Sequence, residues 1–84
     1  MPCLGLAQPD PQEYKVLQKK YDAAKTDSAR VMTLTELSWL YRKYDKSKAV
    51  GYCTQALEMA QKAGYNEGIG FALMAAGNVY NYHS

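Results

Sequence analysis

The chain has 84 residues, enough for one small domain. Ten Lys and Arg against eight Asp and Glu leave a net charge of +2, which is too weak a bias to indicate nucleic acid or an anionic membrane as a partner. No apolar run approaches the roughly 20 residues of a membrane-spanning helix, so no direct membrane insertion is expected.

The first seven residues are apolar and are followed at once by polar sequence. Gly5 and Ala7 place small side chains three and one residues before a cut between Ala7 and Gln8, as signal peptidase requires. Two interpretations stay open for residues 1–8, the remnant of a signal peptide or a disordered tail. The first predicts a periplasmic or other extracytoplasmic location, and the second a cytoplasmic one.

The remaining residues, 9–84, are expected to form one helical domain. The first helix is predicted at 11–25, because Asp10 is a favourable N-cap and Pro11 suits the first helical position. Its apolar side chains recur at helical spacing, at Tyr14, Leu17, Tyr21 and Ala24.

Two further helices are predicted at 29–43 and 46–63. Asp27 or Ser28 is the expected cap of the helix at 29–43, and Gly64 the left-handed residue that ends the helix at 46–63. The predicted inner face of the first of these two comprises Val31, Leu34, Leu37, Ser38 and Tyr41. That of the second comprises Ala49, Val50, Cys53, Ala56, Leu57 and Ala60.

The last helix is predicted at 67–82, with Asn66 as its cap. Its inner face is expected to hold Leu73, Ala76, Gly77 and Tyr80. Gly70 and Gly77 lower the helix propensity, which would be explained by another backbone packed close against them. No segment reads as a strand, so the predicted fold is an all-α antiparallel helix array.

An internal repeat carries most of the information. A shift of 39 residues superposes five positions of one window on the other: Leu34 on Leu73, Leu37 on Ala76, Ser38 on Gly77, Leu40 on Val79 and Tyr41 on Tyr80. Each window is a helix face with a tiny residue between an apolar residue and a Tyr. A tiny residue at that place lets two helices approach closely.

This pattern resembles the tetratricopeptide repeat (TPR) family, whose helix pairs read W-x-x-L-G-x-x-Y and then A-x-x-x-F. The corresponding positions here are Leu34-x-x-Leu37-Ser38-x-x-Tyr41 and then Ala49-x-x-x-Cys53. Leu replaces the first aromatic residue, Ser38 the Gly and Cys53 the Phe, and the period exceeds the usual 34. The resemblance implies an α–α superhelix of about one and a half repeats after a leading helix, truncated at its C-terminus.

The runs Glu36–Arg42 and Gly64–Gly70 also resemble the N-terminal sensor regions of bacterial TPR-containing histidine kinases and regulators. This resemblance implies a module for protein or peptide binding, the first part of a longer array in a signalling protein. It places the partner groove on Met32, Thr35, Trp39, Arg42, Phe71, Met74, Asn78 and Asn81. The alternative is a structural capping or dimerising segment without a ligand of its own, and a third interpretation is an unrelated helical hairpin.

Nothing in the sequence indicates an enzyme, a cofactor or a metal. The single histidine, His83, lies at the end of the chain, and the two cysteines, Cys3 and Cys53, match no metal-binding spacing. Trp39 has two interpretations, a cover for the first helix or an anchor for a ligand. A second copy of the chain is a further candidate partner, through the exposed face of the last helix.

Overall fold

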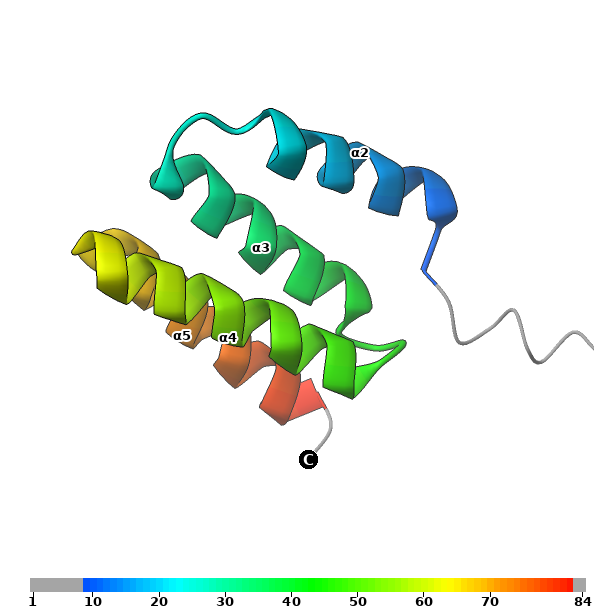
Figure 1. Cartoon of the computed structure of the whole chain (residues 1–84). Helices are drawn as coiled ribbons and strands as arrows, with labels where there is room; N and C mark the ends of the chain where they lie inside the picture. The colour runs from blue at the N-terminus through cyan, green and yellow to red at the C-terminus, as the bar shows by residue number, and fades with distance from the viewer. Residues whose placement is uncertain (1–8, 83–84) are drawn as a thin grey trace, which may run out of the picture.

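The computed structural model describes residues 9–82 and consists of four helices, α2 (Pro11–Ala23), α3 (Asp27–Tyr41), α4 (Lys46–Ala63) and α5 (Asn66–Tyr82). Consecutive helices are antiparallel and joined by short turns (Figure 1). The backbone of α2 approaches that of α3 alone, whereas α5 packs on both α4 and α3. The described part of the chain contains no strand, and the prediction of an all-α antiparallel array is confirmed. Residues 1–8, with the proposed signal-peptide remnant, lie outside the described residues, as does His83.

The first two helices begin at side-chain caps. Asp10 Oδ1 accepts a hydrogen bond from the second amide of α2 at 2.9 Å, as predicted. Helix α3 is capped by Thr26, whose Oγ1 accepts from the amide three residues on at 3.1 Å, so the predicted caps Asp27 and Ser28 are wrong. Thr26 has the extended backbone of an N-cap, and Asp27 already stands in the first helical turn, where its carboxylate favours the helix dipole.

The turn between α4 and α5 was only partly predictable. Gly64 has a φ of 67°, and its amide donates to carbonyls of the last turn of α4, which confirms its predicted role. Helix α5 begins at Asn66 itself, so Asn66 is not the cap. The cap position belongs to Tyr65, because its carbonyl already accepts the amide of Ile69 at 3.0 Å.

The core lies between α3 and α4. All five predicted inner residues of α3 are buried, and on α4 the four small ones are buried while Val50 and Leu57 are half-buried. Ser38 Oγ donates a hydrogen bond to the carbonyl of Ala49 at 2.9 Å, which joins the two helices directly. Both residues are fully buried, as is Ala56, so the prediction that small residues stand where α3 and α4 meet is confirmed.

Helix α5 turns a different face to the core from the one predicted. Leu73 is 54% exposed and Tyr80 51% exposed, and Gly77 is exposed as well. The buried residues of α5 are Gly68, Ala72, Ala75 and Val79. A shift of 38 residues, not 39, therefore relates the buried positions of α3 and α5. Small side chains on this face let α5 approach the alanine-rich face of α4, which Leu and Tyr would hold at a distance.

The glycines of α5 have two different explanations. Gly68 is buried, and a Cβ at this position would overlap the ring of Tyr65, so only glycine fits there. A Cβ at Gly70 or Gly77 would meet nothing within 4 Å, so the expected close backbone is absent in the single chain. Each of these two glycines costs about 1 kcal/mol of helix propensity relative to Ala.

Three tyrosines connect α2, α3 and α4. The rings of Tyr41 and Tyr52 stack at 5.7 Å between centroids, and the ring of Tyr14 meets Tyr41 edge to face at 6.2 Å. Burial raises the pKa of Tyr52 to about 12, with further contributions from the neighbouring Tyr14 and Tyr41. The cluster therefore keeps the Tyr52 hydroxyl protonated in the folded chain at a pH where a free tyrosine ionises.

We expect the chain to lose stability between pH 10 and about 12. The fold holds the Tyr52 proton more tightly than the unfolded chain does, so this contribution is complete below pH 10 and is lost as pH rises through the folded pKa. Urea denaturation followed by circular dichroism across this range measures it. Tyr52→Phe should have a shallower alkaline loss of stability, and an unchanged slope in that variant would contradict the assignment.

Candidate binding surface

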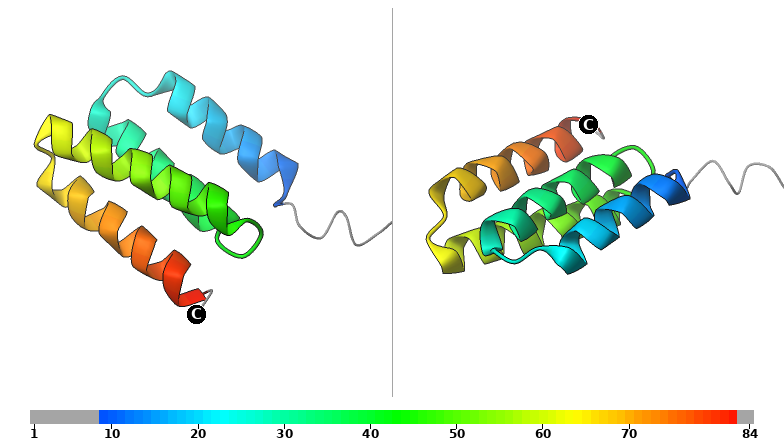
Figure 2. Two further views of the ribbon diagram at one scale, coloured as in Figure 1. Left: turned by 60° about the horizontal axis from the view of Figure 1, so that its bottom comes forward. Right: turned by 90° about the horizontal axis from the view of Figure 1, so that it is seen from above.

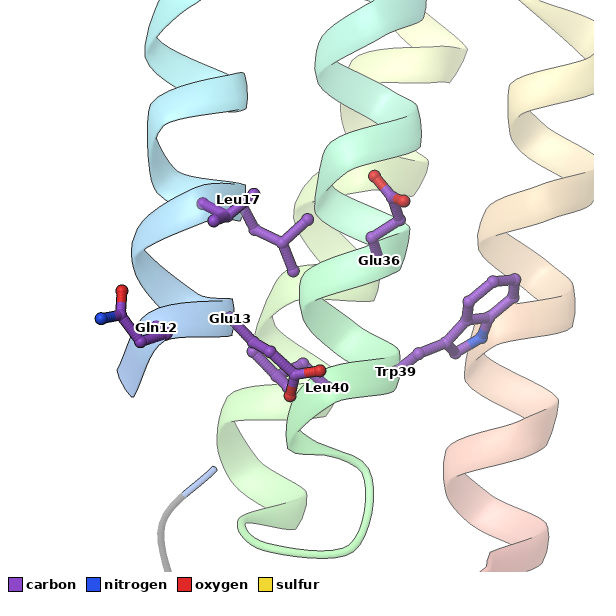
Figure 3. Close-up of a pocket in the computed structure, with 7 residues that line it drawn as sticks. Gln12, Glu13, Leu17, Glu36, Trp39 and Leu40 are labelled. Atoms are coloured by element: carbon purple, nitrogen blue, oxygen red, sulfur yellow. The ribbon is translucent and has the colours of Figure 1, made fainter. Parts of the chain in front are cut away.

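An open hollow of about 550 Å³ lies between α2 and α3 (Figure 3). The backbone of α2 approaches that of α3 alone, and one side of the contact between these helices is left uncovered. Leu17 points from α2 toward α3, and Val16, the residue before it, is 58% exposed. The hollow is lined by Gln12, Glu13, Val16 and Leu17 of α2 and by Glu36, Trp39 and Leu40 of α3.

Trp39 forms the rim of this hollow on α3. Trp39 is 42% exposed, although Ser38 before it is buried and Leu40 after it is half-buried. In Figure 3 the indole projects from α3 on the side away from α2. Trp39 therefore does not cover the first helix, and its ring is accessible to a ligand that rests on α3.

Carboxylates accompany the apolar surface of the hollow. Glu13 and Glu36 both line it, and Glu36 Oε1 accepts a hydrogen bond from Lys20 Nζ at 2.8 Å. The Lys20 and Glu36 side chains are 53% and 39% exposed, so solvent screens this ion pair and it adds little stability. The hollow thus presents apolar side chains in an acidic surrounding.

The four groove residues predicted on α3 have different surroundings. Thr35 is 1% exposed and its Oγ1 donates to the carbonyl of Met32 at 2.7 Å, so it cannot face a ligand. Met32 and Arg42 are half-buried, and the guanidinium of Arg42 lies over the ring of Tyr82, 5.4 Å from its centroid. Of these four residues, Trp39 alone lines the hollow.

None of the four groove residues predicted on α5 lines the hollow. Phe71 is half-buried, whereas Met74 is 58% exposed and Asn78 and Asn81 are exposed. Asn78 Nδ2 donates to the carbonyl of Met74 at 3.2 Å. The structure therefore does not bring the predicted set together in one cavity.

The residues that α2 contributes to the hollow were not predicted from the sequence. The one available signal was Val16, an apolar residue outside the stripe of Tyr14, Leu17, Tyr21 and Ala24. A single apolar residue on a polar helix face is common, so this signal is weak. Glu13 and Gln12 carried no signal at all, since polar side chains are expected in the first turn of an exposed helix.

Among residues 9–82, no three His, Cys, Asp or Glu side chains are grouped so that they could hold a metal ion. Cys53 is a buried free thiol, and burial raises its pKa. In the same part of the chain, no helix combines the length and the apolar character needed to cross a membrane.

Comparisons of the chain with protein-family models, with curated proteins and with solved structures find no match. The fold and the surface define the chain as an all-α helix array with an exposed apolar hollow. The TPR resemblance rests on the sequence pattern alone.

Proposed function

We propose that the chain is a protein-interaction module of TPR type that binds a peptide segment of its partner in the hollow between α2 and α3. The observation that carries this proposal is the exposed Trp39 on the rim of an apolar cavity of about 550 Å³. Tryptophan is enriched among the residues that dominate binding energy at interfaces, and an open concave apolar surface is the usual kind of ligand site. The proposed context, the first part of a longer array in a bacterial signalling protein, rests on the sequence runs alone.

The lining of the hollow indicates the chemistry of the ligand. Val16, Leu17 and Leu40 offer apolar surface for an aliphatic or aromatic side chain, and Trp39 can flank it. Glu13 and Glu36 would attract a Lys or Arg next to that side chain. The best ligand is therefore a segment in which one large apolar residue is followed or preceded closely by a basic one.

The probe for this proposal is a peptide selected from a displayed random library for its binding to the 84-residue chain. We expect Trp39→Ala to weaken the selected peptide by about tenfold or more in calorimetric titration, because the variant removes the largest apolar contact. The variant should stay folded at the temperature of the titration, although its thermal midpoint should fall somewhat because the indole, at 42% exposure, is partly buried. Leu73→Ala is the control, because Leu73 is 54% exposed on α5 and lies outside the hollow.

Two results would contradict this assignment. If Trp39→Ala binds as tightly as the unaltered chain, the hollow is not the site. If Trp39→Ala is unfolded at the temperature of the titration, Trp39 belongs to the core and its loss of binding says nothing about a groove.

A further inference from the structure

Helix α5 carries an exposed face without charge. From Gly68 to Tyr82 the sequence contains no Asp, Glu, Lys or Arg. Outside the buried face lie four exposed residues that we call the outer seam, Gly70, Leu73, Gly77 and Tyr80. Leu73 and Tyr80 are 54% and 51% exposed, and the Lys46 ammonium of α4 lies over the Tyr80 ring, 5.1 Å from its centroid. The seam is therefore an apolar surface that the described residues cover only at its Tyr80 end.

The four residues of the outer seam are spaced along α5 like the contact residues of a two-helix coiled coil. Its members follow one another by three, four and three residues, which is the alternation of the two apolar positions in a heptad. The two glycines occupy one of these positions and the two large side chains the other. A Cβ at Gly70 or Gly77 would meet nothing within 4 Å, so nothing in the single chain requires glycine at either place.

We propose that two copies of this chain pair through their outer seams, with the two α5 helices antiparallel. A two-fold axis level with Ala75 places Leu73 of one copy opposite Gly77 of the other, and Tyr80 opposite Gly70. Each large side chain then fills the hole above a glycine, and both glycines acquire the close backbone neighbour that they lack in one chain. Parallel pairing would instead set glycine against glycine and leave voids.

Two observations favour a second copy over a different protein. In the antiparallel pairing, each large residue of one seam meets a glycine of the same seam in the second copy. The seam is therefore complementary to itself, as a two-fold interface requires of the one surface that forms it. The absence of charge between Gly68 and Tyr82 also means that the residues of the two seams meet without like-charge repulsion, and the Lys46 ammonium lies beside Tyr80, at the end of the seam away from the two-fold axis. A different partner would require neither property.

The pairing is independent of the proposed peptide binding, but it competes with the proposed longer array, because a following helix would cover the same face of α5. Helices α2 and α5 lie on opposite sides of the array (Figure 2), and they do not contact each other. The hollow between α2 and α3 therefore remains open in each copy of the dimer, and failure of either proposal leaves the other in place.

Sedimentation equilibrium of the 84-residue chain over a range of concentrations tests the proposal. We expect a monomer–dimer equilibrium, and we expect Leu73→Glu to weaken it by about tenfold or more, because the variant brings a carboxylate into the apolar contact. The helical circular dichroism of this variant should be retained, since Leu73 is 54% exposed in the single chain. Thr54→Glu, which adds the same charge to the exposed surface of α4, should leave the dimer unchanged.

Gly77→Leu separates pairing from folding. It should raise the stability of the single chain, because its side chain enters open space and Leu favours a helix more than Gly does. It should weaken the dimer, because it fills the hole that Leu73 of the second copy needs. The proposal is overturned if the chain stays monomeric at every concentration, if Leu73→Glu or Gly77→Leu leaves the dimer intact, or if Thr54→Glu dissociates it equally.

Discussion

Leu37→Ala should lower the free energy of unfolding by about 2–5 kcal/mol. Leu37 is 1% exposed, the largest fully buried side chain among the described residues. It belongs to the cluster in which Val31 and Leu34 of α3 meet Ala56 of α4 and Ala72 of α5, so its truncation leaves a cavity where three helices meet. A domain of this size has a total stability of roughly 0.05–0.15 kcal/mol per residue, so this loss is a large fraction of the whole.

Urea denaturation followed by circular dichroism measures this loss, at a low protein concentration that keeps the chain monomeric. Leu73→Ala makes the same substitution at a position that is 54% exposed, and it should cost no more than about 0.5 kcal/mol. Equal losses of stability in the two variants would contradict the burial of Leu37 on α3 and the exposure of Leu73 on α5.

Ala56→Leu should destabilise the chain by about 1–3 kcal/mol through overpacking. Ala56 is 0% exposed and lies in the core cluster with Leu34 and Leu37, where added carbon atoms have no room. Ala63→Leu, at the exposed last residue of α4, adds the same atoms where they meet solvent. Thermal melts of the two variants should therefore diverge, and a melt of Ala56→Leu like that of the unaltered chain would show that the register of α4 is wrong.

The sequence predicted the parts of the fold that depend on local pattern. The bounds of α4 match the structure at both ends, and the stripes of α3 and α4 were identified because a helical face repeats every three or four residues. The end of α4 was predictable because Gly64 adopts a backbone conformation that other residues rarely take.

The face of α5 could not be obtained in the same way. The repeat alignment paired Tyr41 with Tyr80 by side-chain type, but burial pairs Tyr41 with Val79. A shift by one residue turns a helix by about 100°, which moves an entire face out of the core. Which face is buried depends on how closely α5 approaches α4, and that distance is a property of the tertiary packing.

The candidate site was predictable only in part, for a related reason. Helix α3 is contacted by α2, α4 and α5, so it is buried over more of its circumference than one stripe, and Thr33 and Thr35 are buried beside Leu34. Thr35, which was predicted to line a groove on α3 and α5, is therefore buried. The hollow beside α2 depends on how α2 lies on α3, which no local pattern encodes.

The binding of a peptide in the hollow between α2 and α3 is tested most directly by the emission of Trp39, the single tryptophan of the chain. A selected peptide should shift the emission to shorter wavelength and reach saturation at one peptide per chain, because the ligand removes water from an indole that is 42% exposed. Tight binding measured by calorimetry with no change in the emission of Trp39 would place the ligand elsewhere and contradict the proposed function.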